Sequence, residues 1–124
     1  MTTEIQSRQV VRSYHDAWIS GDVTTAGTFL SNEFTNLTPL TNYYEPAPYL
    51  DQLRKFSQQV TGFDMLSELY GTAEATLVYD VHTSMPVGTI RTVEHFRLTD
   101  GKISTIILVF DATPWHKMLE VAGK

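Results

Sequence analysis

The chain has 124 residues, 9 basic and 14 acidic side chains, a formal charge of −5, 42% hydrophobic residues and no cysteine. The missing cysteine excludes thiol nucleophiles, disulfides, thiolate zinc sites and iron–sulfur clusters, and an acidic chain without a Lys/Arg run argues against nucleic acid as a partner. The longest apolar run, residues 106–110, is too short for a bilayer and the start lacks a signal-peptide pattern, so we expect one cytoplasmic domain over residues 1–124 with no membrane partner.

The first third of the chain predicts two helices. Residues 5–20 repeat apolar side chains at intervals of three and four, which is the pattern of a helix with one buried face. Gly21 can end this helix in the left-handed conformation, and Asp22 can cap a shorter helix over residues 24–30.

A short strand and a third helix are predicted next. Residues 34–38 alternate in chemistry and stop at Pro39, because a proline favours an extended conformation in the residue before it. Residues 39–47 form a loop. Pro48 suits the first turn of a helix, whose apolar stripe runs to Val60 and which Gly62 ends.

From residue 63 onward the period of the sequence becomes two, which predicts strands. Residues 77–84 and 92–98 alternate along their length, and residues 99–102 (Thr-Asp-Gly-Lys) carry a hairpin signal that leads into a last strand over residues 103–111. A short helix over residues 114–122 closes the chain. Helices followed by a mostly antiparallel sheet predict an α+β fold.

The last predicted strand is apolar on both faces. A strand of this kind needs a cover on each face, and the helices can supply only one. We therefore expect the chain to form a homodimer through the outer face of the sheet.

The layout resembles the nuclear transport factor 2-like superfamily, in its SnoaL-like and ketosteroid isomerase-like branch. The likeness rests on residues 10–14 running to Gly21-Asp22, on residues 34–39, and on residues 93–98 with 100–103. It implies a cone-shaped fold in which a curved antiparallel sheet wraps around three helices and encloses one deep apolar pocket. The fold leaves the reaction open, because the superfamily includes isomerases, dehydratases, hydrolases, cyclases and binding proteins.

The resemblance also suggests roles for single residues. Tyr14 stands where ketosteroid isomerases have a tyrosine that donates to an oxyanion. Glu94, before His95-Phe96-Arg97, stands where they have a protonated acid. Thr38 stands at the position of their aspartate base, and a threonine hydroxyl cannot remove a carbon-bound proton near neutral pH, which puts that family's own reaction route in doubt.

The alternation of the strand over residues 92–98 decides which ionisable group faces the pocket. It places Glu94 on the same apolar face as Phe96, where we expect it to contact the buried Tyr14. A slip of one residue would instead bring His82 into the pocket and turn Glu94 outward. His15 points about 100° away from Tyr14 around the helix, so we expect it to meet another part of the molecule.

The sequence thus predicts a small-molecule site in which Glu94 is the acid/base, Tyr14 stabilises negative charge and Asn36 orients the reacting oxygen. The four histidines share no metal-ligand spacing, and we expect no cofactor. The ligand is an apolar oxygenated molecule such as a terpenoid, steroid or polyketide. A binding protein without catalysis and a dimeric interaction module are the alternatives. The predicted pocket lining comprises Trp18, Phe34, Thr38, Tyr79, Phe96, Leu108 and Phe110.

Overall fold

The structure is a computed structural model that describes residues 2–122, and it begins with the predicted long helix. Helix α1 spans Glu4–Ile19 and opens with a reciprocal cap between Thr3 and Gln6. Gly21 follows it with a φ of 91°, a left-handed value that glycine adopts without strain. The prediction for residues 5–20 is therefore confirmed. The buried face consists of Ser7, Val11, Tyr14, His15 and Trp18.

The second helix is shorter and the first strand longer than predicted. Helix α2 spans Val23–Gly27 with Asp22 as its cap, and strand β1 spans Leu30–Leu37. Leu30 belongs to the strand because it pairs with Ile103, and a register shift between Leu30 and Thr35 interrupts the alternation along β1. This irregularity explains why the sequence pattern located only the second half of the strand.

The third helix also ends before its predicted stop. Helix α3 spans Pro46–Ser57, and Val60 already begins strand β2, which spans Val60–Tyr70. Val60 fits the helical stripe by spacing, but in the structure it pairs with Thr83 of the neighbouring strand. Register shifts in β2, one of them between Met65 and Ser67, break its period of two and hide it in the sequence.

Three further strands complete the sheet. Strand β3 spans Glu74–Thr83, β4 spans Thr89–Thr99 and β5 spans Lys102–Val109. The β4–β5 hairpin turns at Asp100 and Gly101, whose φ values of 52° and 77° fit a tight turn with two left-handed residues. The predicted strands and hairpin are confirmed, although the last strand ends at residue 109 rather than 111.

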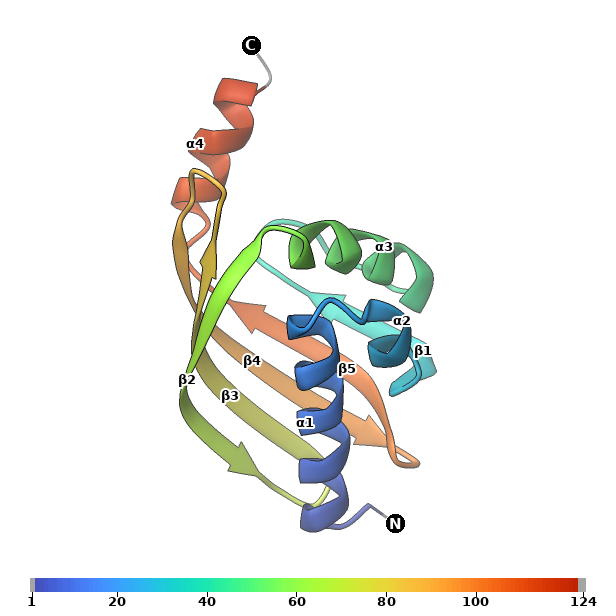
Figure 1. Cartoon of the computed structure of the whole chain (residues 1–124). Coiled ribbons are helices and arrows are strands. Elements are labelled where there is room, and N and C mark those ends of the chain that lie inside the picture. The colour runs from blue at the N-terminus through green and yellow to red at the C-terminus, as the bar shows by residue number, and fades with distance from the viewer. Residues whose placement is uncertain (1, 123–124) are drawn as a thin grey trace.

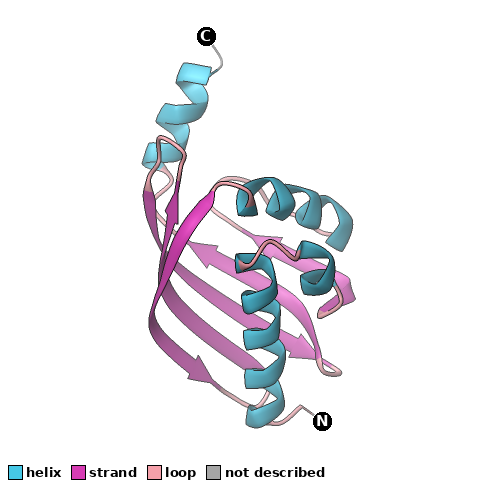
Figure 2. Ribbon diagram, in the orientation of Figure 1, coloured by secondary structure: helices cyan, strands magenta, loops and turns pink. Residues whose placement is uncertain are grey.

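The sheet has the order β1-β5-β4-β3-β2, with β1 parallel to β5 and every other pair antiparallel. It curves strongly, and α1, α2 and α3 lie against its concave side (Figures 1 and 2). The core between these layers holds side chains from alternate positions of the strands, among them Leu77 and Phe96, both fully buried. The architecture is the predicted α+β cone, with β1 as the one parallel addition.

The last helix, α4, spans Thr113–Ala122 and extends beyond the end of the sheet (Figure 1). Its Trp115 ring packs against Phe56 of α3 and Phe110 just after β5, with centroid distances of 6.1 Å in both cases. The helix is thereby joined to α3 and to the segment that follows β5. Within residues 2–122, no helix is both long and apolar enough to cross a membrane.

Candidate functional site

A cavity of about 340 Å³ opens at the end of the cone where α1, α3 and α4 meet the concave face of the sheet. This volume lies at the lower end of the range for small-molecule pockets. Most of the lining is apolar, and no lysine or arginine of residues 2–122 contributes to it. The polar side chains in the lining are Asn36, Thr38, Thr41, Tyr43, Tyr49, Gln52, Tyr79, Thr92 and Glu94.

Among residues 2–122, Glu94 is the only carboxylate that lines this cavity. It lies on β4 between Leu77 of β3 and Leu108 of β5, and 2% of its surface is exposed. Its Oε1 accepts a hydrogen bond from the Tyr79 hydroxyl at 2.9 Å. Its Oε2 has no hydrogen-bond partner among residues 2–122, so it is the oxygen left for a ligand.

His15, which does not line the cavity, lies close to the same carboxylate. Its Nε2 lies 3.4 Å from Oε1 of Glu94, and the ring is 1% exposed. The rings of Trp18, Phe63 and Tyr79 surround it, with centroid distances of 5.1, 4.9 and 4.8 Å. The expectation that His15 meets a different part of the molecule is wrong, because α1 crosses the sheet with both residues 14 and 15 turned inward.

Tyr14 does not contact Glu94 and does not line the cavity, contrary to prediction. Its hydroxyl forms a hydrogen bond with the hydroxyl of Tyr49 on α3, and Tyr79 takes the expected place beside the carboxylate. Tyr49, which the sequence analysis gave no role, lines the cavity instead. Burial is the first cause that raises the pKa of Tyr14, Tyr49 and Tyr79 above the usual phenol value, and the charge of Glu94 adds to it in each case.

Asn36 lies where it was predicted to lie, on the pocket side of β1. Its Nδ2 donates to the Ile106 carbonyl at 3.2 Å, while its buried Oδ1 has no hydrogen-bond partner in the described part of the chain. Thr38 also lines the cavity, but its hydroxyl donates to the Thr41 carbonyl at 2.7 Å and accepts from the amides of Leu40 and Thr41. These bonds hold the loop after β1 and leave Thr38 a structural role.

The predicted apolar lining is partly placed as expected. Trp18, Tyr79, Leu108 and Phe110 line the cavity. Phe34 and Phe96 do not, because they lie deeper in the core: Phe34 packs on Tyr49 at 5.0 Å and Phe96 contacts Tyr14 edge to face at 5.9 Å. The cavity is therefore closer to the α4 end of the molecule than predicted.

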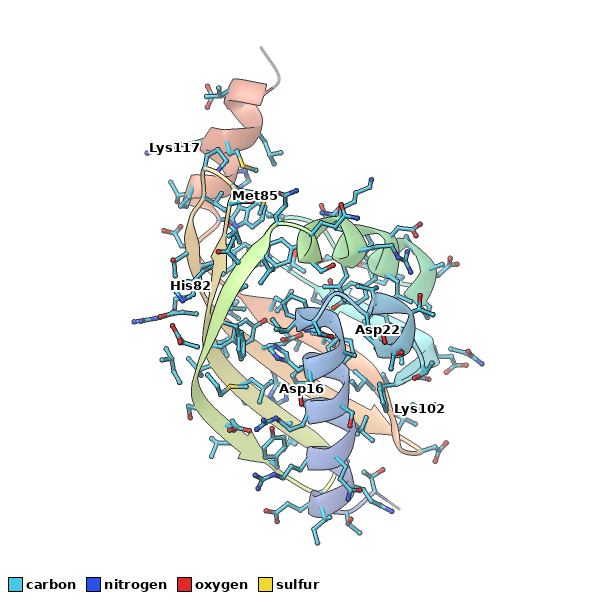
Figure 3. All side chains as sticks on the ribbon, viewed as in Figure 1. Asp16, Asp22, His82, Met85, Lys102 and Lys117 are labelled. Carbon is cyan, nitrogen blue, oxygen red and sulfur yellow. The ribbon has the colours of Figure 1, made fainter. Side chains whose placement is uncertain are left out.

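His82 lies on the opposite face of the sheet from Glu94, at the outer side in Figure 3. Its ring bonds to Asp64 on β2 and Thr89 on β4, both at 2.8 Å. The alternation that places Glu94 inside is thus the observed one, and the catalytic roles of Glu94, Tyr14 and Asn36 stay predictions. Within residues 2–122, no three His, Asp or Glu side chains lie close enough together to hold a metal ion.

The sequence analysis missed His15, Tyr49 and Trp115 as site residues. Val11, His15 and Trp18 repeat at intervals of four and three, so the helical stripe itself could have indicated that His15 is buried. Tyr49 lies within the predicted third helix, and its position there gave no sign that it would line the cavity. No local signal locates Trp115, because only the packing of α4 brings it to the cavity.

Neither a scan of family models nor a search of curated proteins finds a match to the chain. Solved structures do match. A crystal structure of a protein from Kribbella flavida has a TM-score of 0.83 and 25% identity over 93% of this chain and 94% of that chain. An NTF2-like protein of unknown function from Cytophaga hutchinsonii has a TM-score of 0.78 and 21% identity over 94% of this chain and 99% of that one.

A second Kribbella flavida structure, named "putative ketosteroid isomerase", has a TM-score of 0.73 and 18% identity over 90% of this chain and 82% of its own. Sequence identities this low support a shared fold and do not support a shared activity. A de novo designed protein with a curved β-sheet reaches a TM-score of 0.80 at 12% identity. A shared fold does not by itself determine activity. The chain therefore has the nuclear transport factor 2-like fold that its sequence layout resembles.

Proposed function

We propose that this protein is a cofactor-independent enzyme of the isomerase, cyclase or hydrolase type that acts on an apolar oxygenated molecule such as a terpenoid, steroid or polyketide. The observation that carries the proposal is the arrangement of Glu94: Oε1 is held by Tyr79 while Oε2, without a partner among residues 2–122, belongs to a cavity lined mostly by apolar side chains. A carboxylate presented in this way can exchange a proton with a bound ligand.

The phenol pair of Tyr14 and Tyr49 supplies the complementary group. Only one hydroxyl hydrogen can lie between the two oxygens. Tyr14 is fully buried away from the cavity, whereas Tyr49 lines it. If Tyr14 donates to Tyr49, then Tyr49 is free to donate to a ligand oxygen, and every phenol hydrogen has an acceptor. In this proposal Tyr49, rather than Tyr14, stabilises negative charge on the ligand, and Tyr14 supports Tyr49 by donating a hydrogen bond to its hydroxyl.

For an isomerase, the central step is a proton transfer within the ligand. Glu94 Oε2 takes a proton from a carbon next to the ligand carbonyl, and the electron pair of the broken C–H bond moves onto the carbonyl oxygen. That oxygen accepts the hydrogen bond from Tyr49, which stabilises the developing charge. Oε2 then returns the proton to a ligand carbon. The step needs no other reactant, and the buried Oδ1 of Asn36 offers an acceptor for a ligand hydroxyl.

Hydrogen–deuterium exchange tests this proposal without knowledge of the natural substrate. 2-Tetralone, a bicyclic ketone with exchangeable α-protons, is incubated with the protein in D2O and followed by proton NMR. We expect the unmodified chain to accelerate exchange and Glu94→Gln to lose a factor of about 100 or more. Asp80→Asn, a change of the same kind on the outer face of the sheet, should leave the rate unchanged.

The same experiment separates an enzyme from a binding protein. Saturable binding of 2-tetralone without faster exchange would contradict catalysis and favour a carrier that uses the same cavity. Exchange that survives Glu94→Gln would contradict the role of Glu94. Tyr49→Phe should slow exchange while Tyr44→Phe, at an exposed tyrosine, should not.

We also propose that the outer face of the sheet pairs two copies of the chain. Val78, Val93 and Val109 lie side by side across β3, β4 and β5, and 57% of Val109 is exposed. Val93→Asp should convert a dimer to a monomer in sedimentation velocity, while Gln9→Asp on the exposed side of α1 should not. A monomer at all concentrations of the unmodified chain would overturn the proposal.

A further inference from the structure

The most unusual buried group in the molecule is the imidazole of His15. It is 1% exposed, and its Nε2 is a buried polar atom with no hydrogen bond to any of residues 2–122. A buried nitrogen without a partner is destabilising, because it loses its hydrogen bonds to water and gains none in the protein, so such an atom calls for a specific explanation. The proposed proton transfer uses Glu94 and Tyr49 but gives His15 no task.

The surroundings of His15 restrict where its nitrogen can act. Three aromatic rings, those of Trp18, Phe63 and Tyr79, hold the imidazole at centroid distances of 5.1, 4.9 and 4.8 Å. Within this enclosure, Nε2 lies 3.4 Å from Oε1 of Glu94. A shift of a few tenths of an ångström would bring the two atoms to ordinary hydrogen-bond distance, and catalytic hydrogen bonds are often long before a ligand binds.

His15 and Tyr79 therefore approach the same carboxylate oxygen from the protein side. The Tyr79 hydroxyl lies 2.9 Å from Oε1, and the His15 nitrogen shares that target. A second donor beside Tyr79 on Oε1 would resist rotation of the carboxyl group about its last bond. Glu94 lines the cavity, and its Oε2, which has no hydrogen-bond partner among residues 2–122, would then be held in place for a ligand.

We propose that His15 is a positioning residue: its Nε2–H, together with Tyr79, holds Oε1 of Glu94 so that Oε2 is presented to the ligand. This inference rests on the proposed function, because it assigns His15 a role through Glu94 rather than direct contact with the ligand. His15 does not line the cavity, so a change there reaches a ligand through its neighbours: the carboxylate of Glu94, or the Trp18 and Tyr79 rings, which pack on His15 and line the cavity.

Side-chain geometry provides matched variants. The amide nitrogen of glutamine is separated from Cβ by the same number of bonds as Nε2 of histidine, so His15→Gln can restore a donor near the original position. His15→Met is similar in length but has no donor, and His15→Phe keeps an aromatic ring without one. The three variants separate the loss of the hydrogen bond from the loss of packing against the surrounding rings.

The readout is the affinity for two probes of nearly equal shape, measured by isothermal titration calorimetry. 2-Naphthol can donate a hydrogen bond to Oε2, whereas 2-methoxynaphthalene cannot. We expect His15→Met and His15→Phe to weaken 2-naphthol binding by about tenfold, the size typical of a lost supporting hydrogen bond, and to leave 2-methoxynaphthalene binding unchanged. His15→Gln should bind 2-naphthol within about threefold of the unmodified chain.

Each other outcome has a definite meaning. Equal losses for both probes would overturn the proposal and reduce His15 to a packing residue, as would unchanged 2-naphthol affinity in all three variants. If the unmodified chain itself binds the two probes equally, the proposed site at Glu94 fails, and this result is distinct from a failure of His15 alone. Should His15→Phe not fold, the Gln and Met pair still decides the question.

Discussion

The two faces of strands β3 and β4 carry carboxylates that are partnered in opposite ways. On the concave face, Glu94 is 2% exposed, and its polar neighbours are the Tyr79 phenol and the His15 imidazole. On the convex face, Asp80 accepts two hydrogen bonds from Arg91, both at 2.9 Å, in contact with solvent. The comparison shows how one alternating sequence places a buried carboxylate without a cationic arginine partner on one side and an arginine-paired carboxylate on the other.

The difference follows from what each face must contact. A carboxylate in solvent can pair with a flexible arginine and stay charged at little cost. A carboxylate in an apolar cavity needs hydrogen-bond donors that the core itself supplies, and here the Tyr79 hydroxyl on β3 donates to Oε1 while Nε2 of His15 on α1 lies 3.4 Å from the same atom. Oε2 of Glu94 has no hydrogen-bond partner among residues 2–122, whereas the convex carboxylate has both oxygens bonded to Arg91.

The largest expected contrast between the faces is in stability. Phe96 is fully buried on the concave face and Arg97 is exposed next to it. Phe96→Ala should lower the free energy of unfolding by about 3–5 kcal/mol because it leaves a cavity in the core. Arg97→Ala should change it by no more than about 0.5 kcal/mol. Urea unfolding followed by tryptophan fluorescence measures both, and similar losses in the two variants would contradict the assigned register.

The second contrast concerns alkaline pH. The pKa values of Tyr14, Tyr49 and Tyr79 are raised first by burial and then by neighbouring groups that include Glu94. A phenol whose folded pKa is raised contributes stability that is fully present below about pH 10, the unfolded value, and is lost as the pH rises above it. These three phenols should therefore ionise together with unfolding.

Absorbance of phenolate and circular dichroism, recorded on the same samples, test this expectation. The last part of the phenolate signal should appear only as the helical signal disappears. Tyr49→Phe removes one of the buried phenols, so its stability should fall less steeply with pH above about 10. Complete ionisation of every tyrosine in a folded chain would show that the cavity face is open to water.

The sequence predicted the fold well because most of its elements follow a simple period. The stripe of α1 and the alternation along β3 and β4 located these elements and placed Glu94 inside and His82 outside. The errors occur where a second interaction overrides the local pattern. Val60 fits a helical stripe but pairs with Thr83, and the register shifts of β1 and β2 break the period of two.

The site was harder to predict than the fold because its residues meet through tertiary packing. Tyr14 and Glu94 were both correctly expected to be buried, but the orientation of α1 decides which neighbour each one meets. In the structure, Tyr14 reaches Tyr49 on α3, and His15 reaches Glu94. One residue along a helix is enough to exchange these partners, and no sequence spacing reports the rotation of a helix on a sheet.

The smallest expected effect is the contribution of the Asp80–Arg91 pair on the convex face to the free energy of unfolding, which is lost at acid pH. The hydrogen bonds from Arg91 are the first cause that lowers the pKa of Asp80. A carboxyl group with a lowered folded pKa contributes stability that is present above its unfolded value, about 3.9, and is lost as the pH falls through the folded value. Asp80→Asn should therefore be slightly less stable than the unmodified chain at neutral pH.

Because solvent screens this pair, the difference should be small, should shrink further in concentrated salt, and should vanish at about pH 2. Urea unfolding at neutral and acid pH, each at low and high salt, measures it. A difference between Asp80→Asn and the unmodified chain that persists at acid pH would mean that the side chain acts through packing rather than charge. The contact between Asp80 and Arg91 would then stabilise the fold by packing, as the contacts on the concave face do. The contrast between the two faces would lose its electrostatic basis.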